Sequence, residues 1–275
     1  MKSETCYMCD AIATSREHVP PKCLFPESKD SFGHELRSNL FTVPSCDAHN
    51  SRKSKDDEFL MVSLAGVVGN NSIGYRQNQT KVSRAIKESA GHLLALVFRG
   101  ERQAVSASIR NRFVDVIVGT PNVIRLNTCL DRIARGIYCH HFDRPFKGST
   151  RVVMAHLIYT QPNAKAFTLF LKHRAEVDLR QAERIGSNPS VFFYRISEPD
   201  NIGLRILHMC FYEGVDVFAS FIPEGTTLQP NLVNELIQMG VPTCFELEGR
   251  KYWLNEADDQ QQAGPSASGV PSGPP

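Results

Sequence analysis

The segment from residue 122 to residue 142 has hydrophobic side chains at every third or fourth position. The set consists of Val123, Leu126, Leu130, Ile133 and Ile137. Apolar residues at this spacing share one side of an α-helix and indicate a helix that packs on a core. We therefore predict a helix over residues 122–142, and we expect Gly136 to weaken its last turn.

Three further segments show weaker helical patterns. Residues 80–100 predict a helix, because their apolar side chains also recur at helical spacing. Its inner face would be formed by Val82, Ile86, Leu93, Leu94 and Val97. Residues 163–186 predict another helix, with Gly186 as its stop signal. Residues 60–74 are apolar at first and then rich in Gly and Asn, which indicates a helix end followed by a connector.

The pattern changes after residue 186. Residues 190–197 and 204–222 are rich in aromatic and β-branched side chains, which favour strands, and Glu213-Gly214 divides the second segment like a hairpin turn. Residues 257–275 consist mainly of Gln, Pro, Ser, Gly and Ala, which predicts a disordered tail. The chain is therefore expected to have an α+β fold. An N-terminal module would be followed by a mostly helical basic region and a small C-terminal antiparallel sheet.

The composition is that of an ordinary globular protein. Of 275 residues, 41% are hydrophobic and 22% are charged. Neither a run of apolar residues long enough to span a membrane nor the apolar core of a signal peptide occurs in the sequence, so we expect a cytoplasmic protein without a membrane partner. In a reducing compartment the eight cysteines are expected to be metal ligands or buried thiols rather than disulfides.

Charge is distributed unevenly along the chain. Residues 1–58 carry 8 basic and 10 acidic side chains, a net of −2. Residues 76–184 carry 19 basic and 8 acidic side chains, a net of +11, and residues 185–275 carry 4 and 11, a net of −7. A basic middle region between acidic ends indicates a surface that binds a polyanion, although a solvated basic helix face would give the same count.

The N-terminal 60 residues are polar and rich in turn formers, so they need a stabilising cross-link. Cys6 and Cys9 form a C-x2-C pair, and Cys46 and His49 form a C-x2-H pair. Two such pairs predict a closed, tetrahedral, structural zinc site. A redox dithiol would need a thioredoxin-like strand and helix around Cys6, and no strand pattern precedes it. Cys23 and His34 lie outside these pairs and are expected to be bystanders.

Other polar residues within this module suggest catalysis. Glu17 and His18 are adjacent, and Asn50 directly follows the predicted zinc ligand His49. Glu17 and the side-chain oxygen of Asn50 could bind a hard divalent cation such as Mg²⁺, while His18 could take a proton from water. This set of residue types suits metal-assisted cleavage of a phosphodiester bond. Taken singly, each would more often be a capping, turn or surface residue.

In their order, these elements resemble the HNH nuclease family, whose ββα-metal fold carries its active site between a β-hairpin and a helix. The family pattern has a Cys pair, an acidic residue followed by His and Pro, an Asn-Leu, and a second zinc pair that runs into a metal ligand and a Lys. The corresponding residues are Cys6/Cys9, Glu17-His18 with Pro20, Asn39-Leu40, Cys46/His49, Asn50 and Lys53. The resemblance covers about a fifth of the chain.

The resemblance implies a role for each catalytic position. His18 would be the general base, Glu17 and Asn50 would be ligands of the catalytic cation, and Asn39 would hold the loop that orients His18. Three positions depart from the common pattern: Glu17 stands where Asp is usual, His49 replaces a zinc Cys, and Asn50 replaces the final His. The resulting H-N-N variant favours Mg²⁺ or Mn²⁺ over a transition metal.

Basic residues would supply contacts to nucleic-acid phosphates, which give affinity without reading sequence. The candidates are Lys53, Arg84, Arg99, Arg102, Arg110, Arg112, Arg132 and Arg135. His140 and His141, which are adjacent, are expected to be structural or surface residues rather than metal ligands.

The sequence therefore predicts three parts: an HNH module with structural zinc at 1–60, a basic helical and β accessory region that binds DNA at 76–255, and a tail at 257–275. The predicted function is that of a metal-dependent DNA endonuclease. From resemblance alone, we expect it in bacterial anti-phage defence, with proteins of such a system as further partners. A non-catalytic zinc ribbon that binds nucleic acid or a partner, and an RNA nuclease, are the alternatives.

Overall fold

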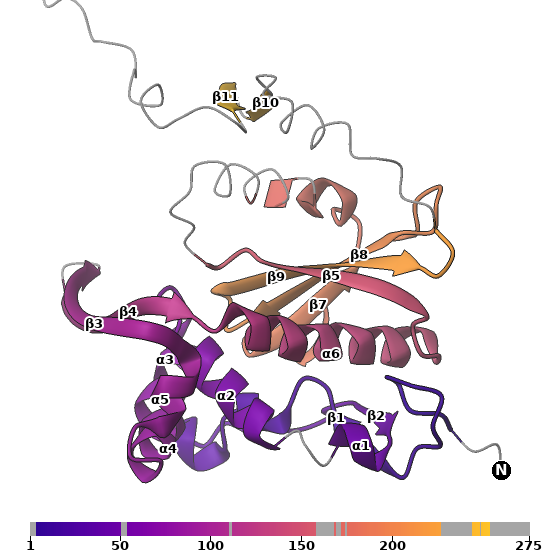
Figure 1. Cartoon of the computed structure of the whole chain (residues 1–275). Coiled ribbons are helices and arrows are strands. Elements are labelled where there is room, and N and C mark those ends of the chain that lie inside the picture. The colour runs from indigo at the N-terminus through magenta and orange to yellow at the C-terminus, as the bar shows by residue number, and fades with distance from the viewer. Residues whose placement is uncertain are drawn as a thin grey trace, which may run out of the picture. The chain divides into compact units, whose positions relative to one another are not determined.

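The computed structural model describes residues 4–50, 54–109, 112–157, 168, 172–173, 175–226, 244–247 and 249–253 (Figure 1). The chain divides into two compact units. The larger unit comprises residues 1–156 and 175–226, and the second comprises residues 157–174 and 227–275. The larger unit thus contains the cysteine-rich N-terminal segment together with most of the predicted accessory region. The predicted tail at 257–275 lies outside the described residues.

Helices and antiparallel sheets together form the larger unit, which confirms the α+β class. Its N-terminal part is a two-stranded antiparallel sheet with short helices around it. The elements are β1 (Ser15–His18), η1 (Lys22–Leu24), η2 (Ser28–Asp30), β2 (Thr42–Ser45), α1 (Asp47–Asn50) and α2 (Ser54–Ala65). The register pairs Ser15 with Ser45 and His18 with Thr42.

Residues 72–97 form a chain of short helices rather than the single helix expected over 80–100. The elements are α3 (Ser72–Gln77), the π-helical turn η3 (Asn78–Val82), α4 (Ser83–Glu88) and α5 (His92–Val97). The break lies at Ala90 and Gly91, whose φ angles of 48° and 81° are left-handed and end a right-handed helix. The predicted inner face holds in part, because Val82, Leu93 and Val97 are buried.

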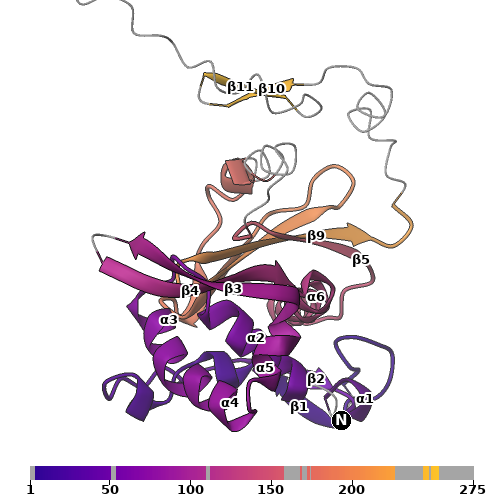
Figure 2. The same ribbon diagram turned by 60° about the vertical axis from the view of Figure 1, so that its left-hand side comes forward.

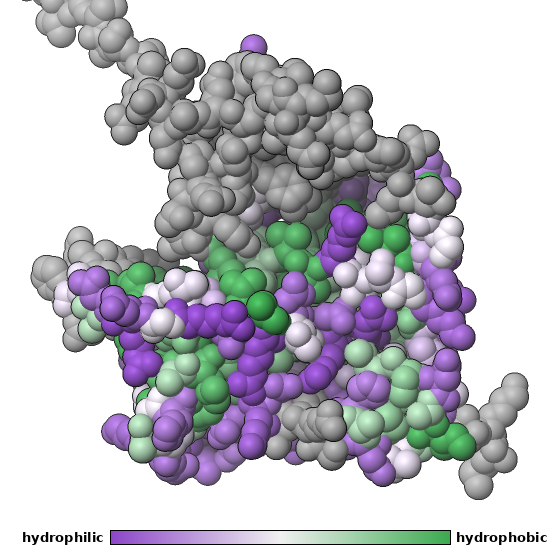
Figure 3. Space-filling model, viewed as in Figure 1, coloured by the Kyte–Doolittle hydropathy of each residue, from purple (hydrophilic) through white to green (hydrophobic). Residues whose placement is uncertain are grey.

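An antiparallel hairpin replaces the end of that predicted helix. Its strands are β3 (Phe98–Ile109) and β4 (Arg112–Pro121), with a register irregularity between Phe98 and Arg102 where Gly100 has a φ of 81°. Helices α2, α4 and α5 lie together on one side of this hairpin (Figure 2). Hydrophilic residues run along the hairpin in the face drawn in Figure 3, with hydrophobic residues beside them.

Helix α6 (Val123–Phe142) confirms the helix predicted over 122–142. Figure 1 shows it between the five-stranded sheet and the N-terminal hairpin. Its apolar face is buried at Leu126, Leu130, Ile133 and Ile137. Gly136 is also buried, and a Cβ atom there would lie 2.7 and 2.9 Å from the two methyl carbons of Val19. This glycine therefore allows the end of β1 to approach the helix closely.

The main sheet has five antiparallel strands in the order β5-β9-β8-β7-β6. The strands are β5 (Gly148–Met154), β6 (Ile185–Asn188), β7 (Phe192–Ile196), β8 (Arg205–Phe211) and β9 (Val215–Pro223). The predicted turn at Glu213-Gly214 joins β8 to β9, as expected. The helix predicted over 163–186 is wrong at its end, because Ile185 and Gly186 belong to β6. In the rest of that segment, residues 168, 172–173 and 175–178 are helical, whereas residues 163–167, 169–171 and 174 lie outside the described residues.

The turn between β8 and β9 is anchored in the N-terminal part of the unit. Tyr212 is fully buried, and its hydroxyl donates a hydrogen bond to the backbone carbonyl of Leu24, 188 positions away. The backbone N–H of Asn71 donates to the carbonyl of Tyr212. Gly214 leaves no room for a side chain, because a Cβ atom there would lie 2.5 Å from the carbonyl oxygen of Gly69. The sheet and the N-terminal segment therefore share one folded unit.

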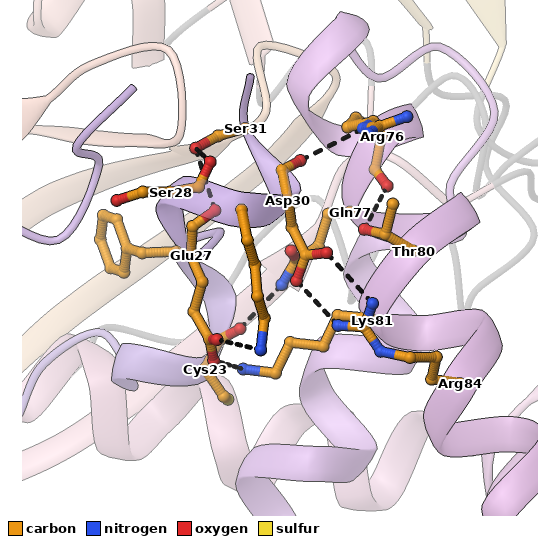
Figure 4. Close-up of polar contacts among 12 residues, drawn as sticks. Cys23, Glu27, Ser28, Asp30, Ser31, Arg76, Gln77, Thr80, Lys81 and Arg84 are labelled. Carbon is orange, nitrogen blue, oxygen red and sulfur yellow. Dashed lines mark hydrogen bonds and ion pairs between the residues drawn. The ribbon is translucent and has the colours of Figure 1, made fainter. Parts of the chain in front are cut away.

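Ion pairs and hydrogen bonds tie the loop between β1 and β2 to the helices that follow α2 (Figure 4). The buried carboxylate of Asp30 accepts two hydrogen bonds from Arg84, at 3.1 and 2.8 Å. The Asp30 carbonyl accepts from Arg76, and the amide of Gln77 donates to the carbonyl of Cys23. Hydrogen bonding to Arg84 holds the pKa of Asp30 below its usual range.

Glu27 is the second acid of this loop. Its carboxylate lies 3.0 Å from Lys29, 3.2 Å from Arg37 and 3.7 Å from Lys81. The hydrogen bond from Lys29 and the positive charge of Arg37 are the main influences that lower the pKa of Glu27 to about 2. Charged contacts therefore hold the loop both within itself, through Lys29 and Arg37, and to the following helices, through Lys81.

The second unit contains one described hairpin, of strands β10 (Cys244–Leu247) and β11 (Arg250–Trp253), paired antiparallel from Cys244–Trp253 to Leu247–Arg250. Among the described residues of the whole chain, the helices are too short or too polar to cross a membrane.

Candidate functional site

Four predicted ligands converge at one point of the larger unit. The ligand atoms of Cys6, Cys9, Cys46 and His49 all lie within 4.8 Å of one another. His49 Nδ1 is 3.5, 3.6 and 3.2 Å from the sulfurs of Cys6, Cys9 and Cys46, and the sulfurs of Cys9 and Cys46 are 3.8 Å apart. Ligands at 2.0–2.3 Å from a tetrahedral zinc ion are separated by about 3.5–3.8 Å. The four residues therefore fit one zinc ion.

Each ligand pair lies in a tight turn that orients its side chains. In the first turn, the N–H of Cys6 donates to the carbonyl of Ala11, and the N–H of Met8 points to the sulfur of Cys6 at 3.5 Å. In the second, the N–H of His49 donates to the carbonyl of Cys46 at 3.1 Å. The backbone N–H of His49 is also the main influence that lowers the pKa of the Cys46 thiol to about 7. A thiol that ionises easily suits a metal, because the thiolate is the ligand.

Glu17 points into the protein from β1. It is 4% exposed, and its two carboxylate oxygens accept hydrogen bonds from the hydroxyls of Tyr7, at 3.0 Å, and Ser45, at 3.3 Å. Burial and the neighbouring carboxylate of Glu17 raise the pKa of Tyr7 well above its usual value, so Tyr7 remains a donor. A carboxylate oxygen has two lone pairs, so these bonds leave Glu17 able to bind a cation as well.

Asn50 contacts β1, the strand that also carries Glu17. Its side-chain nitrogen donates to the hydroxyl of Ser15 at 2.8 Å, which leaves the amide oxygen to serve as a metal ligand. Ser15 and Glu17 are two positions apart in β1 and share one face of the strand, whereas His18 leaves the strand on the other face. Asn50 therefore contacts the strand that carries Glu17, and half-buried His18 lies at the end of that strand.

A small cavity lies beside Glu17. It is lined in part by Glu17, Asp56, Asp57 and Arg132, and its volume of about 10 Å³ is enough for about one water molecule. The carboxylate of Asp56 is held by Arg132, at 2.7 Å, and by Arg125, at 2.8 Å. The start of α2 and the middle of α6 thus bring acidic groups next to the predicted catalytic carboxylate.

Asn39 occupies an exposed position with a left-handed φ of 56°. Its backbone carbonyl accepts a hydrogen bond from Ser187 at 2.7 Å. Two residues later, the ring of Phe41 stacks on the ring of His140 with their centroids 4.0 Å apart. The loop before β2 is therefore fixed to α6 and to β6, and His140 has the structural role expected from the sequence.

The predicted phosphate-binding residues fall into three groups: those paired with an acid, those exposed to solvent, and those whose side chains are not described. Arg84 and Arg132 pair with Asp30 and Asp56, and Arg135 pairs with Asp131 at 3.2 Å. Arg99 and Arg102 are exposed on β3, so they are open to solvent and to a ligand. Lys53 and Arg110 lie outside the described residues, and Arg112 is the first residue of β4.

Comparisons of the chain with protein-family models, with curated proteins and with solved structures find no match. The interpretation of the site therefore depends on the residues of this chain. Three partners were not predicted: Tyr7 and Ser45, which bind Glu17, and Ser15, which binds Asn50. Tyr7 lies within the first cysteine pair and Ser45 precedes the second, so nearness to zinc ligands was their only signal in the sequence.

Proposed function

We propose that this protein is a metal-dependent endonuclease of the HNH type, with a structural zinc ion and a catalytic Mg²⁺ or Mn²⁺ ion, and that its substrate is DNA. One observation supports this most strongly. The chain order of hairpin strand, hairpin strand and helix, β1–β2–α1, carries the zinc-sized cluster and also places Asn50 against the strand that holds Glu17. A zinc knuckle requires Cys6, Cys9, Cys46 and His49 but has no need for this second contact.

The proposed chemistry assigns distinct tasks to the residues. Glu17 and the amide oxygen of Asn50 would hold the divalent cation, and Tyr7 and Ser45 would keep the carboxylate of Glu17 in place. A bound cation would offset negative charge on the phosphate and on the leaving oxygen. A ring nitrogen of His18 would take the proton from the attacking water. The exposed Arg99 and Arg102 would contact the DNA backbone.

The test is cleavage of supercoiled plasmid DNA, and of an RNA of similar length, by zinc-loaded protein with and without Mg²⁺. His18→Ala should lower the cleavage rate by about two orders of magnitude or more, the usual contribution of a positioned base. Asn50→Ala should weaken the response to Mg²⁺, and Mn²⁺ should restore part of it. His18→Ala removes the proposed base and Asn50→Ala removes a proposed metal ligand, so the two variants test these two roles separately.

His34→Ala is the matched control, since His34 is an exposed histidine of the same N-terminal segment. It should cleave at the wild-type rate, and all three variants should retain one zinc ion. If His18→Ala and wild type cleave at the same rate, the assignment of nuclease activity to this site is wrong. Cleavage of RNA alone would make the protein an RNA nuclease. Metal-independent binding of DNA without cleavage would identify a non-catalytic zinc protein.

A further inference from the structure

A second cluster of reactive side chains lies on the five-stranded sheet. A pocket of about 570 Å³ is lined by residues of β7, β8 and β9 and by Arg184 and Glu176 before them. The register places Arg195 opposite His208, and Cys210 opposite Asp216. Because alternate residues of a strand share a face, His208 and Cys210 both point to this side of the sheet. The volume falls within the range of small-molecule sites.

The hydrogen bonds of this cluster fix the tautomer of His208. Nη2 of Arg195 lies 3.1 Å from Nδ1 of His208, and Nε2 of His208 lies 2.9 Å from Oδ1 of Asp216. A guanidinium can only donate, so Nδ1 must be the acceptor. Nε2 then carries the hydrogen and donates it to Asp216. The three side chains form one directed chain, Arg195 to His208 to Asp216, on the floor of the pocket.

This chain argues against a metal ion, although the ligand atoms of His208, Cys210 and Asp216 lie close enough together to hold one. Both ring nitrogens of His208 are engaged, one of them by a cation. Burial raises the pKa of Cys210 to about 12, which keeps its thiol protonated. A metal would have to displace a proton from each of two ligands beside a guanidinium.

The two arginines of the pocket have no carboxylate partner of their own in the part of the chain that the structure describes. Among the described residues, neither Arg184 nor Arg195 has a carboxylate within 4.0 Å, whereas Arg84, Arg132 and Arg205 each have one. Arg184 instead lies over the ring of Phe193, 4.9 Å from its centroid. Within the described ranges of the chain, the buried Nε–H of Arg195 has no hydrogen-bond acceptor, which is unfavourable for a buried donor.

We propose that this pocket binds a small molecule that carries a carboxylate or a phosphate group. The oxyanion would accept from Arg195 and Arg184, in the forked geometry that guanidinium groups offer, and an apolar part would lie against Phe193. Glu176 and Glu213, which are exposed at the pocket, would disfavour polyanions, so a compact ligand with few negative charges fits best. None of these residues belongs to the N-terminal site, so the proposal stands independently of the nuclease.

The experiment uses three probes that share a phenyl ring: benzoate, phenyl phosphate and benzamidine. Binding to zinc-loaded, full-length protein is measured by ligand-observed NMR and by titration. Benzoate or phenyl phosphate should bind with a Kd in the millimolar range or below, and the stronger of the two identifies the head group. Benzamidine, which has the same ring and the opposite charge, should not bind.

Arg184→Gln should raise the Kd of the probe by about ten- to a hundredfold, which is the effect of losing one charge-assisted hydrogen bond. Arg180→Gln removes the same charge from an exposed site outside the pocket lining and should leave binding unchanged. The proposal is overturned if neither anion binds below about 10 mM, or if Arg184→Gln binds as wild type does. It is also overturned if the protein holds a second zinc ion that Cys210→Ser removes.

Discussion

Replacing Gly136 by Ala should destabilise the protein, although alanine is the better helix former. The new Cβ atom would lie 2.7 and 2.9 Å from the two methyl carbons of Val19. Carbon atoms in van der Waals contact are about 3.5–4.0 Å apart, so α6 and the end of β1 must separate by close to 1 Å. Val19 is 2% exposed and cannot turn its side chain into solvent.

The magnitude follows from two opposing terms. An extra methyl group in a packed core costs about 1–3 kcal/mol, and replacing glycine within a helix gains about 1 kcal/mol. The expected net loss is about 1 kcal/mol, which lowers Tm by about 2–4 °C in a unit of this size. Because Val19 follows His18 directly, we also expect slower cleavage without loss of zinc.

Thermal unfolding of four proteins measures the effect: wild type, Gly136→Ala, Val19→Ala and the double variant. The Val19→Ala background lacks both methyl contacts and leaves only the Cβ atom of residue 19, at 3.3 Å, so Gly136→Ala should be close to neutral or slightly stabilising there. Asn127→Ala, at an exposed position of the same helix, is the control and should stabilise by a few tenths of a kcal/mol. A higher Tm for Gly136→Ala in the wild-type background would refute the close contact.

Three further predictions concern zinc, acid and DNA. Cys46→Ser should lose the zinc ion and loosen the N-terminal segment, measured by metal analysis and proteolysis, whereas Cys23→Ser should keep it. The pKa of Glu27 is depressed from 4.5 to about 2, so its contribution to stability is present above pH 4.5 and is lost as the pH falls through 2. Glu27→Gln should therefore lower Tm at pH 7, by no more than the equivalent of about 1 kcal/mol because the pair is a third exposed, and the difference from wild type should vanish near pH 2. Arg102→Gln should reduce the slope of log K against log salt for DNA binding by about 1, whereas Arg84→Gln should lower Tm and leave the slope unchanged.

The parts of the fold that could be predicted from the sequence are those marked by a pattern of neighbouring residues. Helix α6 has an apolar face at regular spacing, and the turn at Glu213-Gly214 interrupts two strongly β-prone runs, so both were predicted correctly. The hairpin of β3 and β4 was not predicted: Ala, Ser and Arg give β3 little strand preference, although Val114, Val116 and Val118 give β4 the composition of a strand. Among the described strands, these two hydrogen-bond only to each other. The spacing of apolar residues within one segment does not reveal such a pairing.

In the candidate site too, some residues could be predicted from the sequence and others could not. The spacing of Cys6, Cys9, Cys46 and His49 is itself the signal of a metal site, and the structure brings those four together. The partners of Glu17 and Asn50 depend on the register of β1 against β2 and on the packing of α1, which the sequence does not encode locally. The arginines show the limit most clearly, since a count of basic residues cannot separate Arg84, paired with the buried acid Asp30, from exposed Arg102.

The bond from Tyr212 to the carbonyl of Leu24 has a consequence for how the protein is made. A chain leaving the ribosome presents the zinc ligands early, but the residue that completes the packing around Leu24 emerges only after 188 further residues. Contacts so distant in sequence form late, because the intervening chain must first be ordered. We therefore expect the N-terminal segment of a nascent chain to hold zinc while remaining immature. Fragments that end before residue 190 should stay open to protease near Leu24, and those that extend to residue 226 should resist it. Such a delay would separate synthesis of the protein from the onset of the proposed nuclease activity.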